Sequence, residues 1–100
     1  MAARTFLAAF ACSLALLACA RHPPLTPVSA GALAARLAND RCQQVYGARP
    51  FQADDFEASQ DAGRWHWGGS ESGKVDGYEV DVSFDRFGGA GQVMVRIPEE

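Results

Sequence analysis

The alternation of apolar and polar side chains between Tyr78 and Asp85 constrains the fold of this chain most strongly. Apolar side chains at every second position share one face of an extended segment, so the pattern predicts a β-strand with one buried and one wet face. Residues 93–97 repeat the alternation, with Met94 and Arg96 pointing outward. Because the glycine-rich residues 87–91 lie between the two segments, we expect them to form a hairpin.

An earlier strand is predicted over residues 64–68, where Trp65 and Trp67 flank His66 and so place it on the opposite face. Residues 54–58, just upstream, allow two interpretations. Phe56 and Ala58 favour a further strand that turns at residues 61–63, whereas the aspartates at the start of the segment, with the Glu and Ala within it, suit a short helix.

Residues 26–46 have the spacing of an amphipathic helix, with Thr26 as N-cap, Pro27 at the first helical position and Gly47 as the C-terminal stop. Arg41 interrupts the apolar stripe, and we expect it either to extend into water or to pair with an acid. The predicted stripe consists of Ala30, Ala34, Leu37, Ala38, Cys42 and Val45.

The element order predicts an α+β fold, in which one N-terminal helix packs on a three- or four-stranded antiparallel meander sheet. A chain of this length supports a single core, so we expect residues 29–100 to form one small domain. The main predicted structural core residues are Trp65, Trp67, Tyr78, Val80, Val82 and Phe84, joined by Phe56, Val93, Val95 and Ile97.

Residues 1–18 have the features of a signal peptide: a basic start at Arg4, then an apolar run over residues 6–17. That run has roughly 12 residues, too few for a membrane-spanning helix of about 20. Its end, residues 16–19, resembles a bacterial lipobox and predicts lipidation of Cys19. Residues 19–28 would then be a proline-rich tether. The alternative is ordinary signal peptidase cleavage after Ala20.

The two processing routes imply two locations. A lipid on Cys19 would bind the protein to the membrane, and Ala20 after it favours the outer membrane, facing the periplasm. Cleavage after Ala20 would instead give a soluble periplasmic or secreted protein. In either case Cys42 is the remaining thiol, which we expect to be buried and inert or, alternatively, in a mixed disulfide with a partner.

Several kinds of function are disfavoured by the composition and spacing. The chain has 12 acidic against 9 basic residues, and the basic residues are scattered, which argues against nucleic-acid binding. The glycine-rich residues 68–73 and 89–91 match neither a nucleophile elbow nor a dinucleotide fingerprint. With no nucleophile–base pair and no metal-ligand spacing, we expect neither enzymatic activity nor a cofactor.

The polar side of the predicted sheet is the candidate binding face. Its candidate residues are His66, Glu79, Asp81 and Arg96.

Three segments carry a family resemblance: Cys42 with residues 46–51, then residues 63–68, then residues 77–85. Their aromatic and glycine pattern resembles small proteobacterial secreted proteins and lipoproteins of unknown molecular activity. The helix-plus-meander layout over residues 29–97 is similar to PepSY-type and β-lactamase-inhibitor-like domains. The resemblance implies a non-catalytic cell-envelope domain that binds an envelope protein. The alternative function is a small-ligand or lipid carrier, or an envelope-stress factor, in the periplasm.

Overall fold

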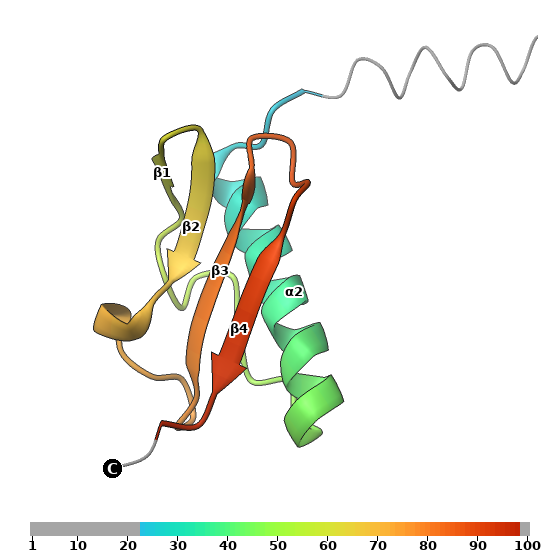
Figure 1. Cartoon of the computed structure of the whole chain (residues 1–100), viewed down its shortest axis with the longest axis vertical. Coiled ribbons are helices and arrows are strands. Elements are labelled where there is room, and N and C mark those ends of the chain that lie inside the picture. Colours follow the sequence, from blue (N-terminus) through green and yellow to red (C-terminus); the bar gives the residue numbers. More distant parts are fainter. Residues whose placement is uncertain (1–22, 99–100) are drawn as a thin grey trace, which may run out of the picture.

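The computed structural model describes residues 23–98, in which one α-helix lies against a four-stranded antiparallel sheet (Figure 1). The predicted α+β class is confirmed, with four strands rather than three. The elements in chain order are α2 (Pro27–Tyr46), β1 (Ser59–Asp61), β2 (Arg64–Gly68), the 3-10 helix η1 (Ser70–Ser72), β3 (Glu79–Asp85) and β4 (Gln92–Arg96).

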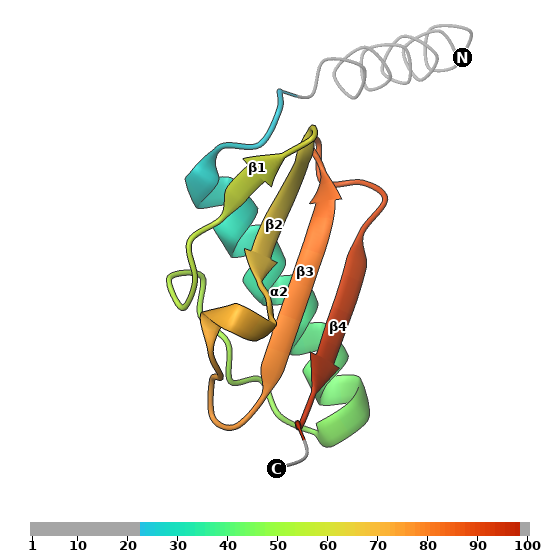
Figure 2. The ribbon, with the colours of Figure 1, turned by 60° about the vertical axis from the view of Figure 1, so that its left-hand side comes forward.

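The sheet is a meander in the order β1-β2-β3-β4, and α2 crosses one of its faces (Figure 2). We call the covered face the inner face and the opposite one the outer face. The pairing register places Trp65 opposite Phe84, and Val82 between Trp67 and Val93. These side chains therefore stack in rows beneath α2 and form the core.

The ends of α2 are fixed by the predicted capping residues. The Thr26 hydroxyl accepts a hydrogen bond from the Ser29 N–H (3.1 Å), and the Ser29 hydroxyl accepts one from the Thr26 N–H (2.8 Å). Pro27 occupies the first turn, where its missing N–H costs nothing. At the other end Gly47 adopts a left-handed conformation (φ 75°), and its N–H donates to the Gln43 carbonyl (3.0 Å).

The buried side of α2 is made of small side chains. Ala30, Ala34, Ala38 and Cys42 are fully buried, which lets the helix backbone approach the sheet closely. The prediction for Val45 was wrong: this side chain is 51% exposed, because it belongs to the last turn of α2, at the end of the sheet (Figure 1).

Two further members of the helix stripe lie at its border. Leu37 is only partly buried, and Arg41 is exposed. Arg41 takes part in neither of the ion pairs found within residues 23–98, so its charge lies in water at the border of the stripe.

Most of the predicted core is confirmed. Trp65, Trp67, Val80, Val82, Phe84 and Val95 are buried. Tyr78 is only partly buried, because it precedes β3 and packs at the end of the core against Tyr46, with ring centroids 5.2 Å apart. The prediction for Ile97 was wrong: it lies just beyond β4 and is 57% exposed.

Both interpretations of residues 54–58 were wrong, because this segment is neither strand nor helix. Its conformation follows from contacts with Trp67. The Phe56 ring meets the Trp67 ring edge-on at 4.9 Å, and the Trp67 indole N–H donates to the Ala53 carbonyl (3.3 Å). The first strand is instead β1, which joins β2 through a two-residue turn with positive φ at Ala62 (52°) and Gly63 (77°).

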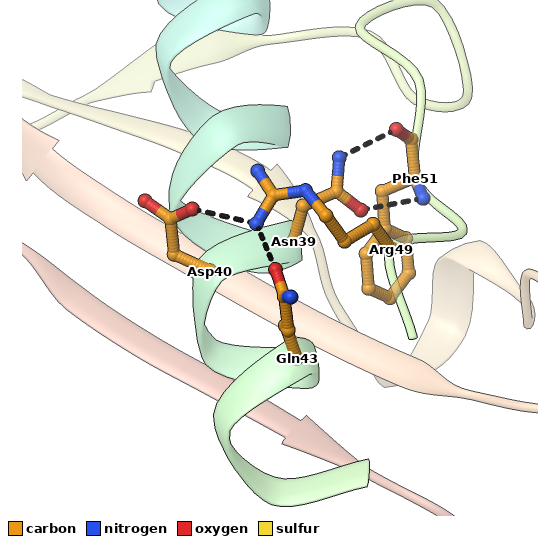
Figure 3. A network of polar contacts seen from close by, with 5 residues as sticks. All are labelled: Asn39, Asp40, Gln43, Arg49 and Phe51. Carbon is orange, nitrogen blue, oxygen red and sulfur yellow. Dashed lines mark hydrogen bonds and ion pairs between the residues drawn. The ribbon is translucent and has the colours of Figure 1, made fainter. Parts of the chain in front are cut away.

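A polar network ties residues 48–58 to α2 (Figure 3). The Asn39 side chain donates to the Phe51 carbonyl (2.8 Å) and accepts from the Phe51 N–H (2.8 Å). Next to it, Arg49 donates to Asp40 (2.9 Å) and Gln43 (2.7 Å). Asn39 lies outside the predicted apolar stripe of α2, yet it is half-buried because it holds Phe51, a core residue that the sequence pattern missed.

The contacts of the domain begin at Leu25, four residues before the predicted boundary at residue 29. The Leu25 N–H donates to the Arg86 carbonyl (2.8 Å), and its side chain packs against the core. The predicted signal peptide (residues 1–18) and Cys19 lie outside the described residues. Within residues 23–98, no helix combines the length and the hydropathy required to cross a bilayer.

Candidate functional site

The outer face of the sheet brings together the four residues predicted as a binding face. His66, Glu79, Asp81 and Arg96 all lie on it, because each alternates with a side chain of the inner face. α2 lies on the other side of the sheet (Figure 2). The charged side chains of the outer face are Asp61, Arg64, Glu79, Asp81, Asp85 and Arg96.

Glu79 and Arg96 bind each other rather than projecting separately. They lie directly opposite on β3 and β4, and the Arg96 Nε donates to a Glu79 carboxylate oxygen at 2.7 Å. The Glu79 side chain is only 12% exposed, whereas that of Arg96 is 57% exposed. Arg96 therefore remains accessible to a partner, while the Glu79 carboxylate is already engaged.

Arg64, at the start of β2, extends across the outer face of β3 toward the turn before β4. Its guanidinium donates to the Ser83 hydroxyl (3.2 Å) and to the Ala90 carbonyl (2.9 Å) in the turn before β4. Ser83, which the sequence pattern placed in water, is therefore only 8% exposed. His66 lies opposite Ser83 and is half-buried, so it offers less surface than predicted.

Asp85 organises the turn that leads into β4. One of its carboxylate oxygens accepts hydrogen bonds from the N–H groups of Gly89 (2.9 Å) and Phe87 (2.9 Å). These bonds, first that from Gly89 and then that from Phe87, lower the pKa of Asp85 below its ordinary value, and the nearby Arg64 adds to this effect. The role of this carboxylate is structural, since its acceptor sites face the turn.

Among residues 23–98, no strand pairs with the outer edge of β4, and no backbone hydrogen bond is formed there. The Val80 carbonyl accepts from the Gly69 N–H (2.6 Å), so the backbone groups of Val80 point toward β2. The backbone groups of successive residues in an antiparallel strand point to opposite neighbours. The N–H and C=O groups of Asp81 therefore point toward β4 and form hydrogen bonds with those of its partner Met94. The N–H and C=O groups of Val93 and Val95 therefore point away from the sheet.

We call residues 92–96, with these free backbone groups, the β4 edge. Its three central side chains, Val93, Met94 and Val95, are uncharged, and Met94 is 37% exposed. A shallow hollow of about 150 Å³ lies beside it on the outer face, and its lining residues are Asp81, Ser83, Gln92, Val93 and Met94.

An apolar groove lies on the other side of the domain, between the first turns of α2 and residues 53–58. Its volume is about 260 Å³, and Val28 at its border is 83% exposed. We call it the α2 groove. Its lining residues are Pro27, Val28, Gly31, Ala53, Asp54, Phe56, Glu57 and Ala58.

Cys42 is buried between α2 and the sheet, as predicted for a buried thiol. Burial raises the pKa of its thiol, and a hydrogen bond with Tyr78 offsets part of that effect. A buried thiol with a raised pKa is a poor nucleophile, so Cys42 acts as a small apolar core residue.

Residues 23–98 hold no group of three or more His, Cys, Asp or Glu side chains placed to bind a metal ion.

The chain matches no family model, no curated protein and no solved structure. Two surfaces thus remain as candidates for function: the β4 edge with its hollow, and the α2 groove.

Proposed function

We propose that this chain is a non-catalytic protein-binding or assembly module of the bacterial cell envelope, which accepts an extended protein segment as an added strand beside β4. The observation that carries the proposal is the β4 edge, where Val93 and Val95 direct N–H and C=O groups away from the sheet and nothing within residues 23–98 pairs with them. An added strand forms backbone hydrogen bonds with such groups irrespective of its side chains.

The side chains of the outer face would distinguish among such segments. Side chains of an added strand point alternately to the two faces, and those on the outer face would lie next to Met94 and the hollow beside it. The lining of the hollow combines Met94 with the polar groups of Asp81, Ser83 and Gln92. This arrangement favours a partner strand with an apolar side chain opposite Met94 and polar side chains on either side of it.

Site-specific photo-crosslinking in intact envelopes tests strand addition. A photoreactive residue at Met94 should give a protein adduct, whereas one at Ser59, on the outer face of β1, should give much less. Ser59 is the matched control because it lies on the same face at the opposite edge of the sheet. Equal adduct yields at the two positions would contradict the proposal.

We also propose that Cys19 carries the lipid that holds the domain at the outer membrane, facing the periplasm, as the lipobox pattern of residues 16–19 predicts. Palmitate labelling of the wild-type chain and of Cys19→Ser tests this step. Label is expected on the wild type alone. Unlabelled wild type would favour the soluble periplasmic or secreted form and leave the β4 edge proposal standing.

The α2 groove supports a second candidate function, that of a small-ligand or lipid carrier. Its lining at Phe56 and Val28 is apolar, and its 260 Å³ would hold about one aromatic ring and a few methylene groups. This is below the range of about 300–1,000 Å³ typical of ligand pockets. Native mass spectrometry of protein from its own host would show a retained apolar molecule if the carrier function holds, and bare protein if it does not.

A further inference from the structure

We infer that the strand accepted by the β4 edge is β4 of a second copy of this chain, paired antiparallel about a two-fold axis through Met94. This inference rests on the proposed function, since it names the partner of the same edge. It makes the domain one half of a symmetric dimer with a continuous sheet across the interface.

The sequence of β4 is complementary to itself. Read in either direction, Gln92-Val93-Met94-Val95-Arg96 runs polar, apolar, apolar, apolar, polar. Antiparallel pairing about Met94 places Met94 opposite its counterpart, Val93 opposite Val95, and Gln92 opposite Arg96. No like charges face each other, and the Gln92 amide oxygen can accept from the Arg96 guanidinium of the other copy.

The free backbone groups fit the same register. With Met94 on the axis, Val93 of one copy and Val95 of the other exchange N–H to C=O hydrogen bonds, and the reverse pair does the same. Every group that β4 directs away from β3 at these two positions thus gains a partner. On the outer face the two Met94 side chains meet at the close, non-hydrogen-bonded position.

The expected dimer is weak in dilute solution. A pair of five-residue strands buries much less than the roughly 1,000 Å² typical of stable interfaces. Attachment of both copies to one membrane would raise their effective concentration and favour pairing there. Covalent trapping is therefore a better test of the dimer than its equilibrium mass.

One added cysteine per chain tests the register in the purified full chain carrying Cys12→Ser and Cys19→Ser, in which the buried Cys42 is kept. The protein is held in nonionic detergent and oxidised with oxidised glutathione. Met94→Cys should form a disulfide dimer, because Cα atoms at such a pair lie about 4.5 Å apart, within disulfide range. Gln92→Cys alone should not, since its two copies would lie about 13 Å apart along the strands. Gln92→Cys mixed with Arg96→Cys should form the mixed dimer.

A proline substitution tests the backbone bonds separately. Val93→Pro removes an N–H that points away from β3, so it leaves the bonds within the sheet in place, as prolines at sheet edges do. In the Met94→Cys chain it should reduce the disulfide dimer at least tenfold. Val93→Thr keeps both the N–H and the branched side chain and should leave the yield within twofold.

The outcomes separate this inference from the proposed function. If Met94→Cys oxidises no faster than Gln92→Cys, or if Val93→Pro leaves the yield unchanged, pairing of two β4 edges is wrong. In that case photo-crosslinking from Met94 to a different protein would still support strand addition. Loss of both the disulfide and the photo-adduct would overturn the proposed function as well.

Discussion

The two edges of the sheet differ in how well they are protected from pairing with another strand. β1 has three residues, Ser59–Asp61, all polar and all exposed, and a short edge of this kind offers little to a strand from another chain. β4 has five residues and an uncharged centre, with its only charge, Arg96, at one end. One edge is thus blunted by length and polarity, whereas the other is left available.

The two sides of the sheet are also supported differently. Beneath β2, Trp67 packs against Phe51 and Phe56 of residues 48–58, with ring centroids 6.2 and 4.9 Å away. Beneath β4 lies α2 (Figure 2). The Leu33 side chain of α2 lies close to Gly88, in the turn before that strand. The β1 side therefore depends on aromatic packing of an irregular segment, and the β4 side on a capped helix.

Trp67→Ala should lower the stability of the domain most, because Trp67 supports β2 and holds residues 48–58 at the same time. Loss of a buried tryptophan costs about 3–5 kcal/mol, a large part of the stability of so small a domain. Urea denaturation followed by circular dichroism measures the effect. His66→Ala, next to it but on the outer face, is the control and should change stability by less than about 0.5 kcal/mol.

Asn39→Ala should weaken the attachment of residues 48–58 to α2. It leaves both the N–H and the C=O of Phe51 without partners at a half-buried position, at a cost of about 1–3 kcal/mol. Gln43→Ala, which removes only an exposed contact with Arg49, should cost about 0.5 kcal/mol or less. Equal losses of stability in the two variants would show that Asn39 does not hold the segment.

The turns beside the two edges of the sheet differ in how tightly their glycines are packed. Gly63, between β1 and β2, and Gly88, before β4, have φ values of 77° and 89°. Alanine at Gly63 meets nothing within 4 Å, whereas at Gly88 its Cβ would lie 2.8 Å from the Leu33 side chain. Both should lower stability, by about 1 kcal/mol at Gly63 and about 1 kcal/mol more at Gly88. Thermal unfolding that ranks them in the opposite order would contradict the packing of Leu33.

The smallest expected effect is the pH dependence that Asp85 gives to the turn before β4. Its pKa is lower in the folded than in the unfolded chain, so its contribution is present above the ordinary value of 3.8 and is lost as the pH falls through the folded pKa. Asp85→Asn lacks this contribution. The difference in melting temperature between wild type and Asp85→Asn should therefore shrink below pH 4, and a constant difference would contradict the prediction.

The regular elements could be predicted from the sequence because their periodicity and capping residues are local. Thr26, Pro27 and Gly47 bound α2 as predicted, and the alternation around Val80 gave both the strand and its buried face. Neighbouring elements that follow one another in the chain also pair in the sheet, so the meander order needed no long-range information.

What the sequence did not reveal depends on contacts between distant residues. The conformation of residues 54–58 is set by the Trp67 side chain, and the burial of Phe51 is set by Asn39, 12 residues earlier. Ser83 is buried because Arg64 lies over it. For the candidate site, the face of His66 and Asp81 was predictable from alternation, but the availability of β4 as an edge required the strand order.

The position of Leu25 has a mechanical consequence. Its N–H bonds to Arg86, and its side chain and that of Leu33 both lie near Gly88, so the chain enters the domain beside the turn that leads into β4. Tension applied through the N-terminal end would thus load this single hydrogen bond and two leucine contacts first.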